Sequence, residues 1–103
     1  MNLDINNTSC TFTIKITDKL TFDNFYDFIQ CYQSAKDIGS EFIVDLRRAC
    51  HIDVSGLGML LLLREYVDNI KGKVSLVFPT QNNQVDRMLK IANFDKTFEI
   101  KKM

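Results

Sequence analysis

Three residues with chemically useful side chains, His51, Asp53 and Ser55, alternate just ahead of a leucine-rich run. Their types match the members of a hydrolase triad, but alternate residues crowded into one turn rarely bring a hydroxyl, an imidazole and a carboxylate into line. A G-x-S-x-G nucleophile elbow is also missing, because aspartate occupies position 53. The spacing therefore favours a binding protein and argues against an enzyme.

Ser55 is expected where a loop turns into a helix. The apolar run at residues 42–46 predicts a strand before it, and the run that starts near Gly56 predicts a helix after it. The first NH groups of a helix lack intrahelical partners and the helix dipole is positive there, so this position suits an anion, including a phosphate on the serine itself. The alternative is that Ser55 caps the helix, although Asp53 could fill that structural role instead.

The rest of the chain predicts the elements that position this segment. Phe12, Ile14 and Ile16 alternate with polar residues, which indicates a strand with one buried face. The other predicted elements are a hairpin arm at residues 3–5 with Asn6-Asn7 after it, a helix from Thr21 with Gly39 after its end, a strand at 42–46, a helix from near Gly56 to near Gly72, a strand at 74–78, a helix at 84–92 and an edge strand at 97–100.

Aromatic side chains are concentrated in the helix predicted to start at Thr21. Phe22, Phe25 and Phe28 recur at helical spacing, so we expect all three to pack in the core. Tyr26 falls off that spacing and is expected to be exposed. A strand, helix and strand in succession indicate parallel neighbours joined by a crossover. The fold class is therefore α/β: a single small domain over residues 1–103, with a mixed four- to five-stranded sheet and helices packed against it.

One face of the central helix is predicted to remain free. At 3.6 residues per turn, apolar residues cover a broad buried arc, and a narrower stripe that includes Ser55 lies opposite. The predicted buried arc is Leu57, Leu60, Leu61, Leu63, Val67 and Ile70, and the predicted stripe beside Ser55 is Gly58, Leu62, Glu65 and Asn69. A leucine within a polar stripe suggests a contact surface, and a glycine there would let a partner's backbone approach closely. Alternatively, Leu62 is a solitary exposed apolar residue that needs no explanation.

Composition excludes several partner classes. Thirteen lysines and arginines balance thirteen aspartates and glutamates, so no nucleic-acid partner is expected. The longest apolar run, residues 57–63, is too short for membrane insertion and the N-terminus does not resemble a signal peptide, so we expect a cytoplasmic protein. Cys10, Cys31 and Cys50 form no C-x-x-C pair, and the glycines fit no nucleotide fingerprint, so neither a metal nor a cofactor is expected.

The segment from Asp53 to Gly58, with the strand ending Val44-Asp45-Leu46 before it and Met59-Leu60-Leu61-Leu62-Leu63-Arg64-Glu65 after it, resembles the signature of the STAS domain. It is most similar to the bacterial anti-sigma factor antagonist branch, and residues 89–100 also resemble these domains. The resemblance implies that Ser55 is phosphorylated by a kinase that is also an anti-sigma factor. It implies further that a PP2C-type phosphatase removes the phosphate, and that the unphosphorylated domain binds the anti-sigma factor and releases its sigma factor.

Val54 departs from a family pattern that often has a second serine or threonine, so Ser55 is the only expected acceptor in the motif. Many members of the family also carry a glycine before the first helix, and this chain has none around residues 18–20. The expected partner-binding residues are Asp53, Ser55, Gly56, Gly58, Leu62, Glu65 and Asn69. The alternative that the resemblance leaves open is a constitutive STAS subunit of a lipid-transport ABC complex, or a stress-signalling scaffold, in which the same stripe is a fixed docking face.

Overall fold

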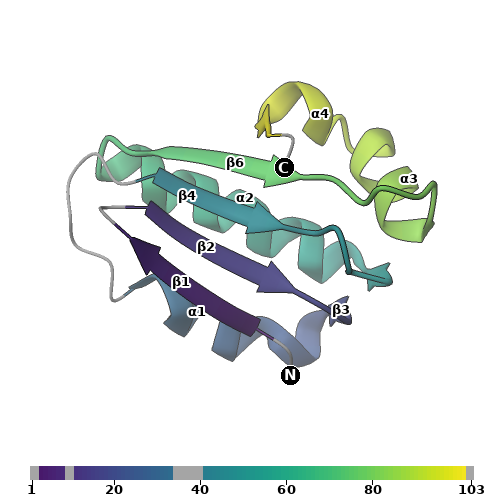
Figure 1. Ribbon diagram of the computed structural model, residues 1–103, viewed down its shortest axis with the longest axis horizontal. Helices are drawn as coiled ribbons and strands as arrows, with labels where there is room; N and C mark the ends of the chain where they lie inside the picture. The colour runs from purple at the N-terminus through teal and green to yellow at the C-terminus, as the bar shows by residue number, and fades with distance from the viewer. Residues whose placement is uncertain (1–2, 9–10, 34–40, 102–103) are drawn as a thin grey trace.

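Five strands pair into one sheet, and helices lie behind it (Figure 1). This computed structural model describes residues 3–8, 11–33 and 41–101. The strands are β1 Leu3–Thr8, β2 Thr11–Ile16, β3 Lys19–Leu20, β4 Glu41–Asp45, β5 His51–Ile52, β6 Lys73–Val77 and β7 Glu99–Ile100. The helices are the 3-10 turn η1 Phe22–Asn24, α1 Phe25–Gln33, α2 Val54–Asn69, α3 Gln84–Ile91 and α4 Phe94–Thr97.

The sheet confirms the predicted α/β class and its mixed character. Its strand order is β1-β2-β4-β6-β7, in which β1 pairs antiparallel with β2 and every other pair is parallel. Parallel neighbours need crossover connections, and α2 provides the one between β4 and β6. This order places β4 in the middle of the sheet. The chain that leaves β4 passes through a turn and β5 before it reaches Ser55.

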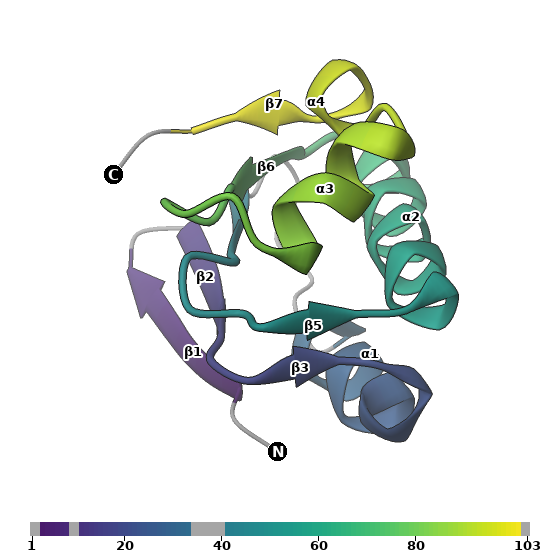
Figure 2. The same cartoon turned by 90° about the vertical axis from the view of Figure 1, so that its right-hand side faces the viewer.

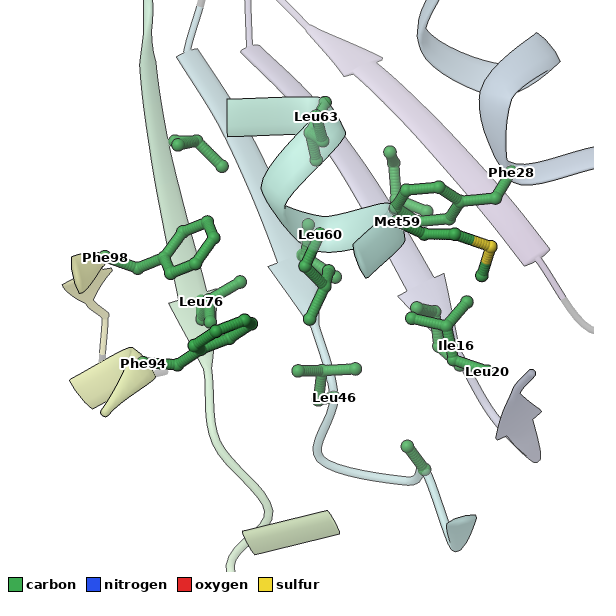
Figure 3. Close-up of a cluster of buried hydrophobic side chains, with 14 of the residues drawn as sticks. Ile16, Leu20, Phe28, Leu46, Met59, Leu60, Leu63, Leu76, Phe94 and Phe98 are labelled. Carbon is green, nitrogen blue, oxygen red and sulfur yellow. The ribbon is translucent and has the colours of Figure 1, made fainter. Parts of the chain in front are cut away.

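Alternate residues of the central strands form the floor of the core. Ile14, Val44 and Leu76 lie in one row across β2, β4 and β6, and all are buried beneath the helices. The central helix packs onto this row through Met59, Leu60 and other apolar residues (Figure 3). Full burial of each such side chain stabilises the fold by about 1.5 to 3 kcal/mol. Removing α2 from this face would therefore expose most of the core.

A second, two-stranded sheet sets the starts of α1 and α2 beside each other (Figure 2). Strands β3 and β5 pair in parallel, with Lys19 opposite His51 and Leu20 opposite Ile52. Strand β5 leads into α2 after one residue, and β3 leads after one residue into the 3-10 turn η1, which continues into α1. The sequence did not predict this pair, because two-residue strands are too short to show an alternating pattern.

The prediction that Phe22 and Phe25 pack in the core is wrong. Both are exposed, whereas Phe28 is buried and Tyr26 is exposed as expected. The inward row of this segment is Asn24, Phe28 and Tyr32, at four-residue spacing, which places the other aromatic residues off the buried face.

Several boundaries also differ from the prediction. The central helix begins at Val54, two residues before Gly56, because Asp53 caps it. Strand β1 continues through Asn6-Asn7 to Thr8. Helix α4 includes Thr97, the first residue of the expected edge strand, and β7 is Glu99–Ile100. The expected helix stop at Gly39 lies outside the described residues. Within the described ranges, no helix has both the length and the apolar character needed to cross a membrane.

Candidate functional site

Asp53 is the N-cap of α2. Its backbone is extended (φ −111°, ψ −176°), and its Oδ1 accepts a hydrogen bond of 2.8 Å from the Gly56 NH. Its carbonyl oxygen accepts the first intrahelical bond, from the Leu57 NH at 3.1 Å. An aspartate in this position satisfies a free NH and places negative charge at the positive end of the helix dipole. The capping role that the sequence left open between two residues therefore belongs to Asp53.

Ser55 is the second residue of α2 and has no capping duty. Its side chain is half-buried, and within residues 3–8, 11–33 and 41–101 no hydrogen bond engages its hydroxyl. The NH groups of Val54 and Ser55 stand in the first turn, where no intrahelical acceptor is available. A hydroxyl that is free of structural bonds and close to unpaired NH groups can accept a modification without loss of a fold contact.

Gly56 is buried, unlike the other residues expected to bind a partner. A Cβ at this position would clash with the carbonyl oxygen of Leu20 and lie 2.7 Å from Cγ1 of Ile52. The close approach of α2 to the two-stranded sheet thus requires glycine. Gly56 positions the start of the helix, and its burial removes it from the expected contact surface.

The rest of the expected stripe lies on the outer side of α2. Leu62, Glu65 and Asn69 are exposed, and Gly58 is half-buried with nothing within 4 Å of the place a Cβ would occupy. With Ser55 these residues follow one another at three- and four-residue spacing, so they share one face of the helix. Leu62 is 43% exposed, which leaves a large apolar side chain in the middle of this face.

Leu61 was expected in the core, but it is 44% exposed. The helix packs inward through Met59, Leu60, Leu63 and Val67, and Leu61 lies about 100° further round the helix than Leu60. The apolar character of Leu61 suggested burial, but its angular position on the helix exposes it to solvent. Leu61 therefore widens the apolar part of the outer face.

Two further apolar residues stand at the paired helix starts, and the sequence did not identify them as part of the site. Val54 is 77% exposed and Phe22 is 69% exposed. Strands β3 and β5 lie side by side (Figure 2), and their register gives these residues equivalent positions, each two residues after the end of its strand. Phe25 stacks on Phe22, with 6.0 Å between ring centroids. Like Leu61 and Leu62 on α2, these are large apolar side chains left open to solvent, and such side chains are a feature of contact surfaces.

The segment before Ser55 is bonded by β3 on one side and by the start of α3 on the other. The Gln84 side chain donates to the Ile52 carbonyl at 2.8 Å and accepts from the Ile52 NH at 2.9 Å. Asn83 caps α3 through Oδ1 and donates through Nδ2 to the Ala49 carbonyl at 3.0 Å. A backbone bonded on both sides has little freedom to move, so the start of α2 is preorganised.

The residues that resemble a triad do not form a hydrogen-bonded relay. His51 is exposed on β5, and Asp53 accepts from a backbone NH. In the part of the chain that the structure describes, no hydrogen bond joins either residue to Ser55. The geometry is that of a capped helix start with a free hydroxyl.

Comparison with known proteins identifies the domain family. The family model described as the STAS domain matches residues 2–103. A STAS-domain containing protein of Pseudomonas aeruginosa (strain UCBPP-PA14) is 35% identical over 88 residues, which are 85% of this chain and 85% of that protein.

Two solved structures have a similar fold. One is the anti-sigma factor antagonist SpoIIAA in its unphosphorylated form, with a TM-score of 0.74 and 17% identity, covering 99% of this chain and 89% of that chain. The other is a candidate anti-sigma factor antagonist of Thermotoga maritima, with a TM-score of 0.78 and 18% identity, covering 98% and 86%. At such low identity these two structures bear on the fold alone.

Proposed function

The chain belongs to the STAS domain family, and from that premise we propose that it is an anti-sigma factor antagonist switched by phosphorylation of Ser55. In this proposal the unphosphorylated protein binds an anti-sigma factor that is also its serine kinase. A PP2C-type phosphatase restores the binding form. The domain itself is a binding protein of the cytoplasm and not an enzyme.

The free hydroxyl of Ser55 is the observation that carries this proposal. Asp53 satisfies the Gly56 NH, so the serine is not needed to begin the helix. The unpaired NH groups of the first turn and the helix dipole both favour an added phosphate. The negative charge of the Asp53 carboxylate repels a phosphate on Ser55 and offsets part of this stabilisation. We expect phosphorylation to leave the fold intact.

The switch would act through the partner surface. Phosphorylation adds about −1.5 to −2 charge and strong acceptor oxygens to Ser55. A partner that covers the neutral hydroxyl together with Gly58 and Leu62 would then bury an unpaired dianion. Loss of even one good buried contact commonly costs about 1 to 3 kcal/mol, and a buried unpaired charge costs more. Binding is then controlled by local electrostatics without refolding.

The expected role of Asp53 in partner binding can be separated from its capping role. Our hypothesis is that its second carboxylate oxygen also orients the Ser55 hydroxyl or the incoming phosphoryl donor, because it precedes the serine by two residues. Asn caps helices as well as Asp does, so Asp53→Asn should preserve the helix start and remove the charge. Normal phosphorylation of Asp53→Asn would sink the hypothesis.

A capture experiment tests the proposed function. The whole chain, carrying either serine or biosynthetically installed phosphoserine at position 55, is used as bait in a lysate of its own cells. We expect the unmodified bait to retain a protein with a histidine-kinase-like ATPase domain and the phosphorylated bait to lose it. Retention of that protein by both baits would contradict the switch, and stable retention of a transport ATPase by both would favour the transport subunit.

Leu62→Glu tests the outer face of α2. It places a carboxylate on the exposed side of α2 without altering Ser55, and should therefore weaken retention of the same ATPase protein. Lys96→Glu, on α4, adds a carboxylate at another exposed position and should leave retention unchanged. Equal retention by all three proteins would show that the outer face of α2 does not contact the partner.

A further inference from the structure

A basic hollow lies at the carboxyl ends of β2 and β4. The β4 strand leads into a turn closed by the Ala49 NH donating to the Leu46 carbonyl at 3.1 Å, which places Arg47 and Arg48 at the two corners. This turn and the end of β2 enclose about 240 Å³. The lining residues are Lys15, Ile16, Thr17, Asp45, Arg47 and Arg48. Open α/β sheets commonly bind ligands outside the carboxyl ends of their strands.

Asp45 fixes the direction of one guanidinium in this hollow. Its Oδ1 accepts from Arg47 Nε at 3.0 Å and its Oδ2 accepts from Nη2 at 2.8 Å, while the Arg47 NH also donates to Oδ1 at 3.1 Å. Burial alone would raise the pKa of Asp45, but the hydrogen bonds and charge of Arg47, with the charge of Lys15, lower it. Asp45 therefore stays ionised and fixes the orientation of the Arg47 guanidinium. Two of the five guanidinium N–H groups are used in this pair.

The local charges favour an anion. Three cations, Lys15, Arg47 and Arg48, line the hollow, and Asp45 is the lining carboxylate. Three positive charges against one negative charge leave an excess of two positive charges among the lining residues. The guanidinium N–H groups of Arg47 that do not bond Asp45 are already oriented by this pair, so they can bind a phosphate or carboxylate with little further ordering.

A second, mostly apolar hollow adjoins the first and shares Arg47 with it. Its volume is about 320 Å³, and it lies between β6 and β7 where the chain leaves the sheet. Its other lining residues are Val77, Phe78, Pro79, Thr80, Ile100 and Lys101. Small-molecule sites typically combine an apolar wall with a few convergent polar groups, and these two hollows together provide both.

We propose that the two hollows form a binding site for a small phosphomonoester that carries an apolar or aromatic group. The phosphate lies among Lys15, Arg47 and Arg48, and the apolar group lies against Phe78 and Ile100. This site does not include Ser55, and it does not depend on the function proposed for that residue.

Two probes separate the two halves of the site. Inorganic phosphate tests the basic hollow alone, and phenyl phosphate tests both hollows. Binding is measured by amide chemical-shift titration of the full chain at fixed ionic strength. We expect both probes to bind saturably, with phenyl phosphate tighter by about three- to tenfold because its ring covers apolar surface. Equal affinities for the two probes would overturn the assignment of the second hollow.

Matched variants locate the binding. Lys15→Ala and Arg48→Ala should each lower the affinity for both probes by about three- to tenfold. Each substitution removes one charge-assisted contact that is partly open to solvent. Ile100→Ala should weaken phenyl phosphate only. Lys96→Ala, an exposed cation on α4 outside both hollows, is the control and should change neither affinity. Binding that fails to saturate, or that is equally strong in Lys15→Ala and Arg48→Ala, would overturn the proposal.

Discussion

The two helices that begin side by side start in different ways. At α2, Asp53 caps a regular helix directly, and Ser55 is left without a structural bond. At α1, a 3-10 turn comes first, and the buried Asn24 side chain accepts from the Thr21 NH at 2.9 Å. The Thr21 hydroxyl is buried and has no partner among the described residues. The register of β3 and β5 makes Thr21 the equivalent of Asp53, so the hydroxyl at the cap of one start is trapped, while the accessible hydroxyl of the other start belongs to Ser55, two residues after its cap.

The phosphorylation proposed for Ser55 requires that another residue cap the helix. Ser and Thr usually serve such positions as caps, and a capping hydroxyl cannot be modified without loss of its bond. Asp53 performs that task here, and Gly56 lets the helix approach the two-stranded sheet. The α2 start is therefore stable independently of Ser55, which the following substitutions test.

Gly56→Ala should have the largest effect. The new methyl group would clash with the Leu20 backbone and the Ile52 side chain, and overpacking against backbone has no cheap relief. We expect a loss of about 3 kcal/mol in the free energy of unfolding, measured by urea denaturation. Gly58→Ala is the control: with open space at its Cβ, it should gain up to about 1 kcal/mol from helix propensity. Equal effects at both glycines would refute the packing role of Gly56.

Asn24→Ala should disrupt the α1 start by an intermediate amount. It removes the acceptor for the Thr21 NH and leaves a small cavity at a buried position. We expect a loss of about 2 kcal/mol in unfolding free energy, from the unpaired NH and the lost packing. Hydrogen exchange should show faster opening of α1 than of α2. Uniform acceleration in both helices would mean that the two starts are not independent.

Asp53→Ala should cost about 1 kcal/mol in unfolding free energy, because the Gly56 NH loses its acceptor while the helix remains packed. Asp53→Asn should stay within about 0.5 kcal/mol of the parent protein, since asparagine also caps. The same urea denaturation series measures both. If alanine and asparagine were equally destabilising, the negative charge and not the hydrogen bond would dominate the cap.

Ser55→Ala should change the unfolding free energy least, by no more than about 0.5 kcal/mol. The reason is the lack of any hydrogen bond to its hydroxyl within the described residues. Its thermal unfolding midpoint should match that of the parent protein. A loss as large as that of Asp53→Ala would mean that the serine shares the capping role.

The sequence predicted the sheet and its main helices because the alternation in β2 and the apolar runs of β4 and β6 reflect which faces are buried. It did not predict the β3–β5 pair, whose two-residue strands show no pattern. It also placed Phe22, Phe25 and Leu61 in the core, since apolar character does not reveal on which side of a helix the protein lies. Asn24, a polar residue, holds the inward position that an aromatic residue was expected to fill.

For the site, the sequence identified Asp53 and Ser55 as the two residues able to cap α2, but it could not choose between them. That choice depends on a bond of 2.8 Å to the Gly56 NH, which spacing does not encode. It placed Gly56 among the contact residues, although the nearness of the Leu20 carbonyl makes it a packing residue. Phe22 could not be recognised, because its place beside Val54 arises from the pairing of two strands that are distant in the sequence.

Site-resolved mass spectrometry of the protein isolated from its own cells, before and after a stress stimulus, is the most direct test of the Ser55 switch. We predict a reversible fraction carrying one phosphate, located on Ser55, which disappears in Ser55→Ala. A phosphate confined to another residue, or a Ser55 that is never modified under any condition in which the protein binds its partner, would contradict the proposal.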